Sequence, residues 1–198
     1  MVVALAVFLA LAIGLVTRGH IGNLAQIRIR WWPFLVLAVA LQAYAVDHWA
    51  TDSLGPIPLR TGAFVATQLL ILAVAAVNFR LPGFRLVILG VASNLLALVA
   101  NGGLMPVSAE ARVTIGHQAT VDAMATGTAV MNSKGVVLPA AQTNLWILTD
   151  IFILPPPFPL PAVVSVGDIL VALGVGVLII RTMHDSTKFK IGGSSHGL

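Results

Sequence analysis

Two aspartates interrupt apolar segments of this sequence, and they are the side chains best placed to do chemistry. Asp168 lies in VVSVGDILVALG, and Asp150 lies in LWILTDIF. A carboxylate within an apolar membrane segment is costly to bury, so it is a candidate for binding a ligand or transferring protons. Two buried carboxylates that meet can share one proton. The sequence leaves open whether these two meet.

A structural role for Asp168 competes with this chemistry. Ser165 precedes it by three residues, so SVGD fits a capping box in which Asp replaces the usual Glu or Gln. A helix would then begin near Val166. The carboxylate would also be placed to accept hydrogen bonds from Asn94, from Asn101 or from the amides of a Gly-Gly turn. The residues fit either role for Asp168. It can cap the helix or pair with another side chain, or it can bind a ligand or transfer protons.

The stretch NGGLMP is the second candidate. Asn101, Gly102 and Gly103 follow an apolar run over residues 86–100, and Asn or Gly in the left-handed conformation ends helices well. Pro106 prevents the helix from resuming. A helix stop accounts for these residue types, but adjacent glycines also let a ligand or another backbone approach closely.

The sequence contains no motif for a metal site or for enzyme catalysis. The chain has no cysteine, which excludes thiolate ligands and thiol catalysis. Glu110 and His117 would share a helix face, but a metal site needs three or four converging ligands. No G-x-S-x-G, H-E-x-x-H or P-loop sequence occurs. We therefore expect no metal site and no cofactor, and we favour a protein that is not an enzyme.

The elements that must position these residues are those of a membrane protein. Of 198 residues, 58% are hydrophobic and only 9% are charged, and the mean hydropathy is +0.98. A soluble domain has about 25% charged residues, so the bilayer is expected to act as the solvent. The pI of about 10.4 comes from basic residues at membrane edges. Membrane lipids are therefore the expected partners, and nucleic acid is not.

Five apolar segments are long enough to cross a membrane as helices, some with help from flanking residues. They are residues 1–16, 31–50, 61–77, 86–100 and 163–180. Eight of the eleven Lys and Arg residues lie in the first loop, the third loop and the tail over residues 181–198. The positive-inside rule places these parts in the cytoplasm and the N-terminus outside. The sequence thus predicts an all-α, multi-pass protein with a single membrane domain, residues 1–198.

The predicted extracytoplasmic cap is the segment over residues 101–162, between the fourth and fifth apolar segments. Residues 106–124 are expected to contain a short helix with Ser108 as its N-cap. TAVMNSKGVVL, residues 128–138, is a hairpin candidate. Residues 143–154 are too short and interrupted to span the membrane, which favours an interfacial or re-entrant helix.

Four stretches taken together resemble a known family. They are NGGLMPVSAEA (101–111), T-x-L-W-x-L-x-D-I (143–151), the proline-rich P-P-x-P, and VVSVGDILVALG (163–174). Over residues 86–180 they are similar to the DUF5317 type of small polytopic bacterial membrane proteins. The resemblance implies a protein of the bacterial cytoplasmic (plasma) membrane and supplies no activity. By this analogy the candidate ligand-binding site comprises Asn101, Gly102, Gly103, Met105, Pro106, Asp150, Gly167 and Asp168.

These features predict a non-enzymatic membrane protein. It would be either an accessory subunit of a membrane-protein partner or a binder of a small apolar or amphipathic ligand beneath the cap. Residues 101–106 would form one wall of an outer pocket and Asp168 the opposite wall. The alternative is a carrier or membrane enzyme in which Asp168 and Asp150 handle protons. The ligand, the partner and any oligomerisation stay open.

Overall fold

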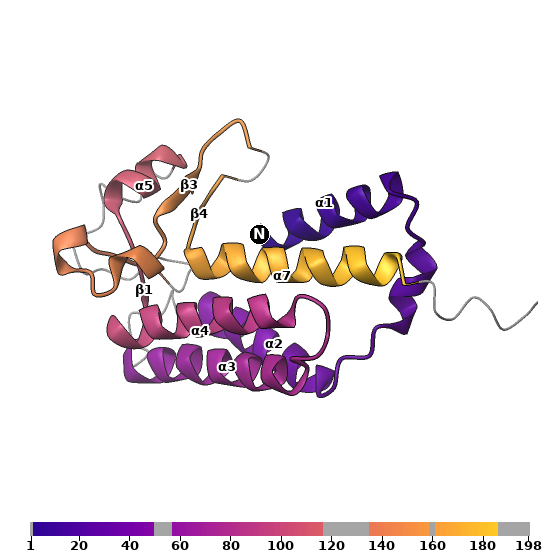
Figure 1. Cartoon of the computed structure of the whole chain (residues 1–198). Coiled ribbons are helices and arrows are strands. Elements are labelled where there is room, and N and C mark those ends of the chain that lie inside the picture. Colours follow the sequence, from indigo (N-terminus) through magenta and orange to yellow (C-terminus); the bar gives the residue numbers. More distant parts are fainter. Residues whose placement is uncertain (1, 50–56, 117–134, 159–160, 186–198) are drawn as a thin grey trace, which may run out of the picture.

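Five long helices form the body of the protein in a computed structural model, which describes residues 2–49, 57–116, 135–158 and 161–185 (Figure 1). They are α1 (Val2–Val16), α2 (Trp32–Trp49), α3 (Ile57–Val77), α4 (Phe84–Ala100) and α7 (Val166–Met183). Contacts join neighbouring helices in the order α2, α3, α4, α7 and α1. The five apolar segments predicted from the sequence are confirmed as helices, with ends shifted by a few residues.

One helix of the described residues, α7, is long and apolar enough to cross a membrane by itself. In the other four long helices the described apolar stretches are shorter, at 10–17 residues. α7 begins at Val166 rather than at residue 163, because Ser165 caps it and the residues before Ser165 form a strand. A mostly helical fold is therefore confirmed, whereas five membrane crossings remain a prediction.

Helices α4 and α7 pack closely because their glycines face each other at two levels. A Cβ at Gly90 would lie 2.5 Å from the main-chain oxygen of Gly167, and a Cβ at Gly174 would lie 2.7 Å from that of Gly83. Gly83, the N-cap residue of α4, and Gly90 are about two turns apart, as are the two glycines of α7, so they form one stripe along the contact. Small residues of this kind let two helix backbones approach without a side chain between them.

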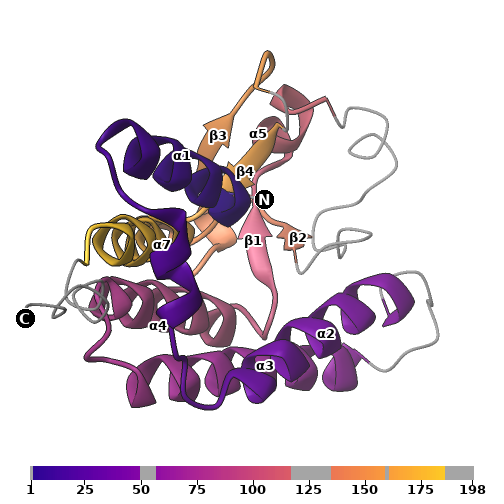
Figure 2. The same ribbon diagram turned by 90° about the vertical axis from the view of Figure 1, so that its right-hand side faces the viewer.

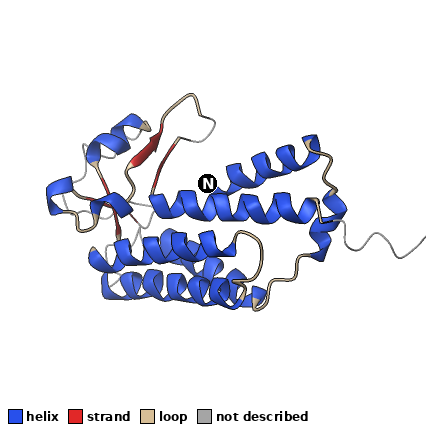
Figure 3. Ribbon diagram, in the orientation of Figure 1, coloured by secondary structure: helices blue, strands red, loops and turns tan. Residues whose placement is uncertain are grey.

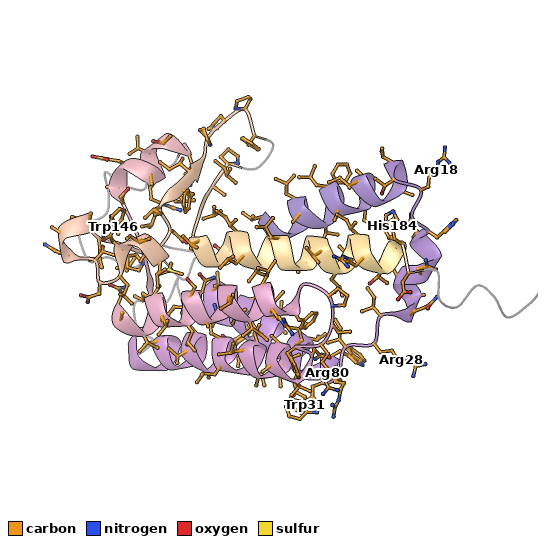
Figure 4. The ribbon with its side chains drawn as sticks, viewed as in Figure 1. Arg18, Arg28, Trp31, Arg80, Trp146 and His184 are labelled. Atoms are coloured by element: carbon orange, nitrogen blue, oxygen red, sulfur yellow. The ribbon has the colours of Figure 1, made fainter. Side chains whose placement is uncertain are left out.

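The helices have two chemically different ends. Arg18, Arg28, Trp31 and Arg80 lie at one end, which we term the arginine end, and Trp146 lies at the other, the cap end (Figure 4). The arginine end is closed by the connection between α1 and α2, which contains the 3-10 helix η1 (Ile21–Gln26) and packs on the C-terminus of α7.

His184 joins this connection to α7 through its ring. Nδ1 lies 2.8 Å from the Ile180 oxygen, and Nε2 lies 3.1 Å from the Thr17 oxygen. Only the imidazolium can donate to both carbonyls at once. The hydrogen bond to Ile180 and then that to Thr17 raise the pKa of His184 above the usual 6.5. The protonated ring is therefore the form that ties the two segments together.

The described residues of the cap end form short strands, the helix α5 and the 3-10 turns η2 and η3 (Figure 2, Figure 3). In chain order the described elements are β1 (Met105–Val107), α5 (Ala109–Thr114), β2 (Gly135–Val137), η2 (Ala140–Gln142), η3 (Trp146–Leu148), β3 (Phe152–Leu154) and β4 (Ala162–Val164). β1 pairs in parallel with β2, with Pro106 opposite Val136. β3 pairs antiparallel with β4, with Ile153 opposite Val163.

The prediction of a helix over residues 143–154 is wrong. The described structure there is η3, which covers three residues, followed by β3. The physical reason is main-chain pairing with distant segments: the Asp150 N–H donates to the Pro106 oxygen at 3.3 Å, and β3 pairs with β4. These partners replace the local bonds that a helix would use. The fold class is corrected from all-α to mostly helical, with two small sheets among the described residues.

The short helix predicted within residues 106–124 begins at Ala109, directly after β1 and Ser108. Ser108 is its N-cap, as predicted, since the side-chain oxygen accepts from the Ala111 N–H at 3.1 Å. The end of that prediction, residues 117–124, lies outside the described residues. So does most of the hairpin predicted over residues 128–138, of which β2 is the described part.

Candidate functional site

A cleft of about 240 Å³ opens at the cap end between β1, α5, η2, η3 and β3. Two carboxylates line it, those of Glu110 and Asp150. Its other lining includes Trp146, whose side chain is half exposed, and the aliphatic side chains of Leu138 and Ile153. Apolar walls with a few placed polar groups are the usual composition of a small-molecule site.

Capping and main-chain pairing position the two carboxylates. Because Ser108 caps α5, Glu110 falls in the first turn of that helix. The Asp150 N–H donates to the Pro106 oxygen at 3.3 Å, and Asp150 forms a bridge with Val107. Pro106 is buried in β1 and lines the cleft. The segment that contains Asp150 is therefore joined to NGGLMP through main-chain bonds.

A partly buried cation, Arg112, accompanies Glu110 on α5. Arg112 is in the last turn of this helix, and burial lowers the pKa of its guanidinium below the usual 12.5. Its Nε has no hydrogen-bond partner among the described residues. Since an arginine stays protonated at neutral pH, the helix keeps a positive charge near the cleft.

Asn101 ends α4 and fastens the cap to it. Its Nδ2 donates to the Ala97 oxygen and to the Asn144 oxygen, both at 2.8 Å, and its Oδ1 accepts from the Asn144 N–H at 2.9 Å. The Asn144 side chain returns a bond to the Ala100 oxygen at 2.9 Å. Asn101 is therefore the C-cap that the sequence predicted, and it also holds the start of the segment that leads to Trp146.

Gly102 and Gly103 both have left-handed backbones, with φ of 70° and 84°. Gly103 also packs tightly, because a Cβ there would lie 2.9 Å from the Cβ of Thr61 in α3. Gly102 faces open space. The next site candidate, Met105, has no exposed surface. These residues build the helix stop and the floor beneath the cap, and they do not line the cleft.

Asp168 is tied into a small polar cluster between α4 and α7. Its Oδ1 accepts from the Asn94 Nδ2 at 2.8 Å, and its Oδ2 accepts from the Ser165 N–H at 3.3 Å. The Ser165 hydroxyl accepts from the Asp168 N–H at 3.0 Å and donates to the Asn94 Oδ1 at 2.8 Å. The capping box and the pairing with Asn94 are both confirmed. Gly167 beside it packs on Gly90 and Asn94.

The structure separates the predicted site residues into two groups. Pro106 and Asp150 line the cleft. Asp168 does not, and its hydrogen bonds go to Asn94 and Ser165 rather than to Asn101 or Asp150. Asp168 is thus not part of this cleft, and the pocket with Asp168 opposite residues 101–106 stays a prediction. Within the described residues, no group of three His, Cys, Asp or Glu side chains is placed to hold a metal ion.

Sequence reasoning missed most of the cleft lining. Leu138, Thr143, Trp146 and Ile153 come together only because β2, η2, η3 and β3 are brought beside β1 and α5. Elements of three residues carry no periodicity that could signal their pairing. The one available signal was Trp146, a large aromatic residue in a segment beside predicted turns.

Comparisons with known proteins give one match. The model of DUF5317, described as a family of unknown function, matches residues 26–180. This range includes the 86–180 region where the sequence motifs lie and extends it to α2 and α3. No curated protein matches the chain, and no solved structure matches it.

Proposed function

The chain belongs to DUF5317, a family of unknown function, and on that premise we propose that it is a multi-pass membrane protein whose cleft binds a small amphipathic molecule. The bound molecule would place an apolar part against Trp146 and Ile153 and a hydrogen-bond-donating or cationic head near Glu110 and Asp150. In this proposal the protein is a binding module of the bacterial cytoplasmic membrane and not an enzyme.

Exposed apolar side chains support the membrane part of the proposal. Large hydrophobic residues more than half exposed occur on helices throughout the bundle, among them Phe8, Val39, Leu96 and Leu173. Only 33% of the apolar window of α7 is buried inside the protein, whereas the core helix of a soluble protein is mostly buried. Water would penalise such surfaces, and lipid chains would not.

The distribution of basic residues supports an orientation. Arg18, Arg28 and Arg80 lie at the arginine end, opposite Trp146 (Figure 4). By the positive-inside rule the arginine end faces the cytoplasm, and the cap and the N-terminus face outward. Each long helix would cross with help from its flanking residues, since a helix shorter than about 20 residues can be matched by local thinning of the bilayer.

The orientation can be tested directly because the chain has no cysteine. Single-cysteine variants at Gly22 and Gln142 would be treated with a membrane-impermeant maleimide in intact cells and after permeabilisation. We expect Gln142→Cys to react in intact cells and Gly22→Cys only after permeabilisation. The reverse pattern would invert the orientation, and equal reactivity of both in intact cells would contradict membrane crossing.

The cleft is the single observation that carries the binding part of the proposal. Its volume of about 240 Å³ is below the range of about 300–1,000 Å³ usual for drug-sized ligands. A ligand, or the part of it that enters the cleft, is therefore small. Carboxylates carry negative charge and only accept hydrogen bonds, so a protonated amine, which adds a positive charge to its N–H donors, suits this lining better than an uncharged alcohol of the same shape.

The binding test uses 3-phenylpropylamine and its uncharged analogue 3-phenylpropanol. Protein labelled with 5-fluorotryptophan gives a ¹⁹F signal for Trp146, which the Trp146→Phe variant assigns, and one for Trp31 at the opposite end as a control. We expect the amine to shift the Trp146 signal saturably, with little effect on Trp31, and to bind more weakly to Glu110→Gln. Equal shifts of both signals, or the same affinity for amine and alcohol, would count against this site.

Proton handling by Asp168 and Asp150, the alternative function, has less support. Both carboxylate oxygens of Asp168 accept hydrogen bonds within its own cluster, and a carboxylate so engaged is suited to hold two helices together.

A further inference from the structure

A second cavity lies at the arginine end, where η1, the connection from α3 to α4 and the last turn of α7 meet. Its volume is about 210 Å³. Its lining includes two arginines, Arg28 and Arg181, whose side chains are exposed, and the amide residues Asn23 and Gln26. Its apolar lining includes Leu81 and Leu178. The cavity is independent of the cleft at the cap end, and none of its residues belongs to that site.

Hydrogen bonds fix the walls of this cavity before any ligand is present. The Asn23 Nδ2 donates to the Met183 oxygen at 3.0 Å and to the Asp185 oxygen at 3.3 Å. The His20 N–H donates to the same Met183 oxygen at 2.9 Å. The exposed carbonyls at the C-terminus of α7 are thus partly satisfied from within the chain. The negative end of the α7 helix dipole lies at these carbonyls, and the positive charge of Arg181 offsets it further.

The charges in the cavity favour an anion. Neither Arg28 nor Arg181 forms an ion pair with a carboxylate among the described residues. Asp185 is the single acidic residue among the described residues of the lining, so the two arginines carry more charge than the one acid. A guanidinium presents a planar fork of N–H donors that matches the oxygens of a phosphate group.

We propose that this cavity binds a phosphate group through Arg28 and Arg181. The apolar floor at Leu81 and Leu178 suits the glycerol and first acyl carbons of an anionic phospholipid, and free inorganic phosphate offers the same head-group chemistry. The cavity is at the arginine end of the helices. A phospholipid with its phosphate group in the cavity would have its acyl chains along the helix bundle.

The experiment measures how much phosphatidylglycerol stays bound to the purified full chain. Protein in detergent micelles with equal amounts of phosphatidylglycerol and phosphatidylcholine is examined by native mass spectrometry. We expect retention of phosphatidylglycerol, reduced about tenfold in Arg28→Gln and in Arg181→Gln, since a charge-assisted hydrogen bond is lost in each. Arg18→Gln removes the same charge at the same end but outside the cavity (Figure 4), and it should retain the lipid.

A competition arm separates the two sources of phosphate. Inorganic phosphate that displaces phosphatidylglycerol from the wild-type protein identifies a site for the free ion, and no displacement identifies a lipid site. Arg181→Lys keeps the charge but loses the fork, so intermediate retention is expected, and the circular dichroism of each variant shows whether the helices are intact. Equal loss in all three glutamine variants, or no loss in any, would overturn the proposal. Neither result depends on the cleft at Trp146, so the two proposals fail separately.

Discussion

Replacing Ser165 by Ala and Asp168 by Asn tests whether the acid in α7 holds two helices together. Ser165 has no exposed surface, and Asn94 is 4% exposed. Ser165→Ala deletes a hydroxyl that accepts from the Asp168 N–H and donates to the Asn94 Oδ1. It therefore removes the N-cap of α7 and leaves a buried acceptor on α4 without its donor.

The magnitudes follow from these contacts. Loss of a Ser N-cap costs about 1 kcal/mol, and an orphaned buried acceptor costs about 1–3 kcal/mol. Since one hydroxyl makes both bonds, we expect Ser165→Ala to lower the free energy of unfolding by roughly 2–3 kcal/mol. Asp168→Asn keeps the acceptor for Asn94 and loses only the bond from the Ser165 N–H at 3.3 Å. It should cost roughly 1 kcal/mol.

The assay is unfolding by sodium dodecyl sulfate from mild-detergent micelles, followed by the far-ultraviolet circular dichroism of the helices. Ser108→Ala is the matched control, because Ser108 caps α5 in the same way but forms no bond to another helix in the described part of the chain. The double variant Asn94→Ala with Asp168→Ala, set against both single variants, gives the coupling energy of the interhelical bond. We expect about 0.5–2 kcal/mol for that coupling.

The order of the effects decides the outcome. If Ser165→Ala cost no more than Ser108→Ala, the bond to Asn94 would contribute nothing measurable, and the structural account of the cluster would be wrong. If Asp168→Asn left stability unchanged and abolished a proton-coupled transport activity, the alternative function would replace the binding proposal.

Three further predictions rest on the glycines and on His184. Gly103→Ala should destabilise the protein more than Gly102→Ala. Both variants incur the left-handed backbone cost of roughly 1–2 kcal/mol, but only the new Cβ at position 103 also collides with α3. Thermal unfolding of the two variants tests this order. Gly167→Ala should cost about 1–3 kcal/mol by overpacking, whereas Gly62→Ala, with open space around it, should be neutral or slightly stabilising in the same assay. Because the pKa of His184 is raised, the stabilising contribution of its protonated ring should be complete below pH 6.5 and should be lost as the pH rises through the raised pKa. Unfolding measured at several pH values should show this loss of stability in the wild-type protein and not in His184→Gln.

Local sequence patterns were sufficient to predict the long helices and their capping residues. A long apolar run predicts a helix because its main chain must satisfy itself where water is absent, and all five runs are helical. The caps at Ser108, Asn101 and Ser165 depend on bonds that reach only three or four residues, so the residue types and their spacing predict them.

The cap was predicted less well. Residues 143–154 look like a helix in isolation, but β3 pairs with β4, and Asp150 bonds to Pro106 more than forty residues earlier in the chain. Three-residue strands have too few side chains to show an alternating pattern, and their stability comes from partners that local sequence does not identify.

The sequence by itself therefore determined the helical segments, their capping residues and the capping role of Asp168, because each depends on apolar length or on contacts within one helical turn. The tertiary structure alone decided that Asp168 pairs with Asn94 rather than with Asn101, that Asp150 and Glu110 line one cleft, and that Arg28 and Arg181 line one cavity at the opposite end. Each of these pairs is brought together by helix packing or strand pairing between distant segments, where the geometry of the whole chain selects the partner.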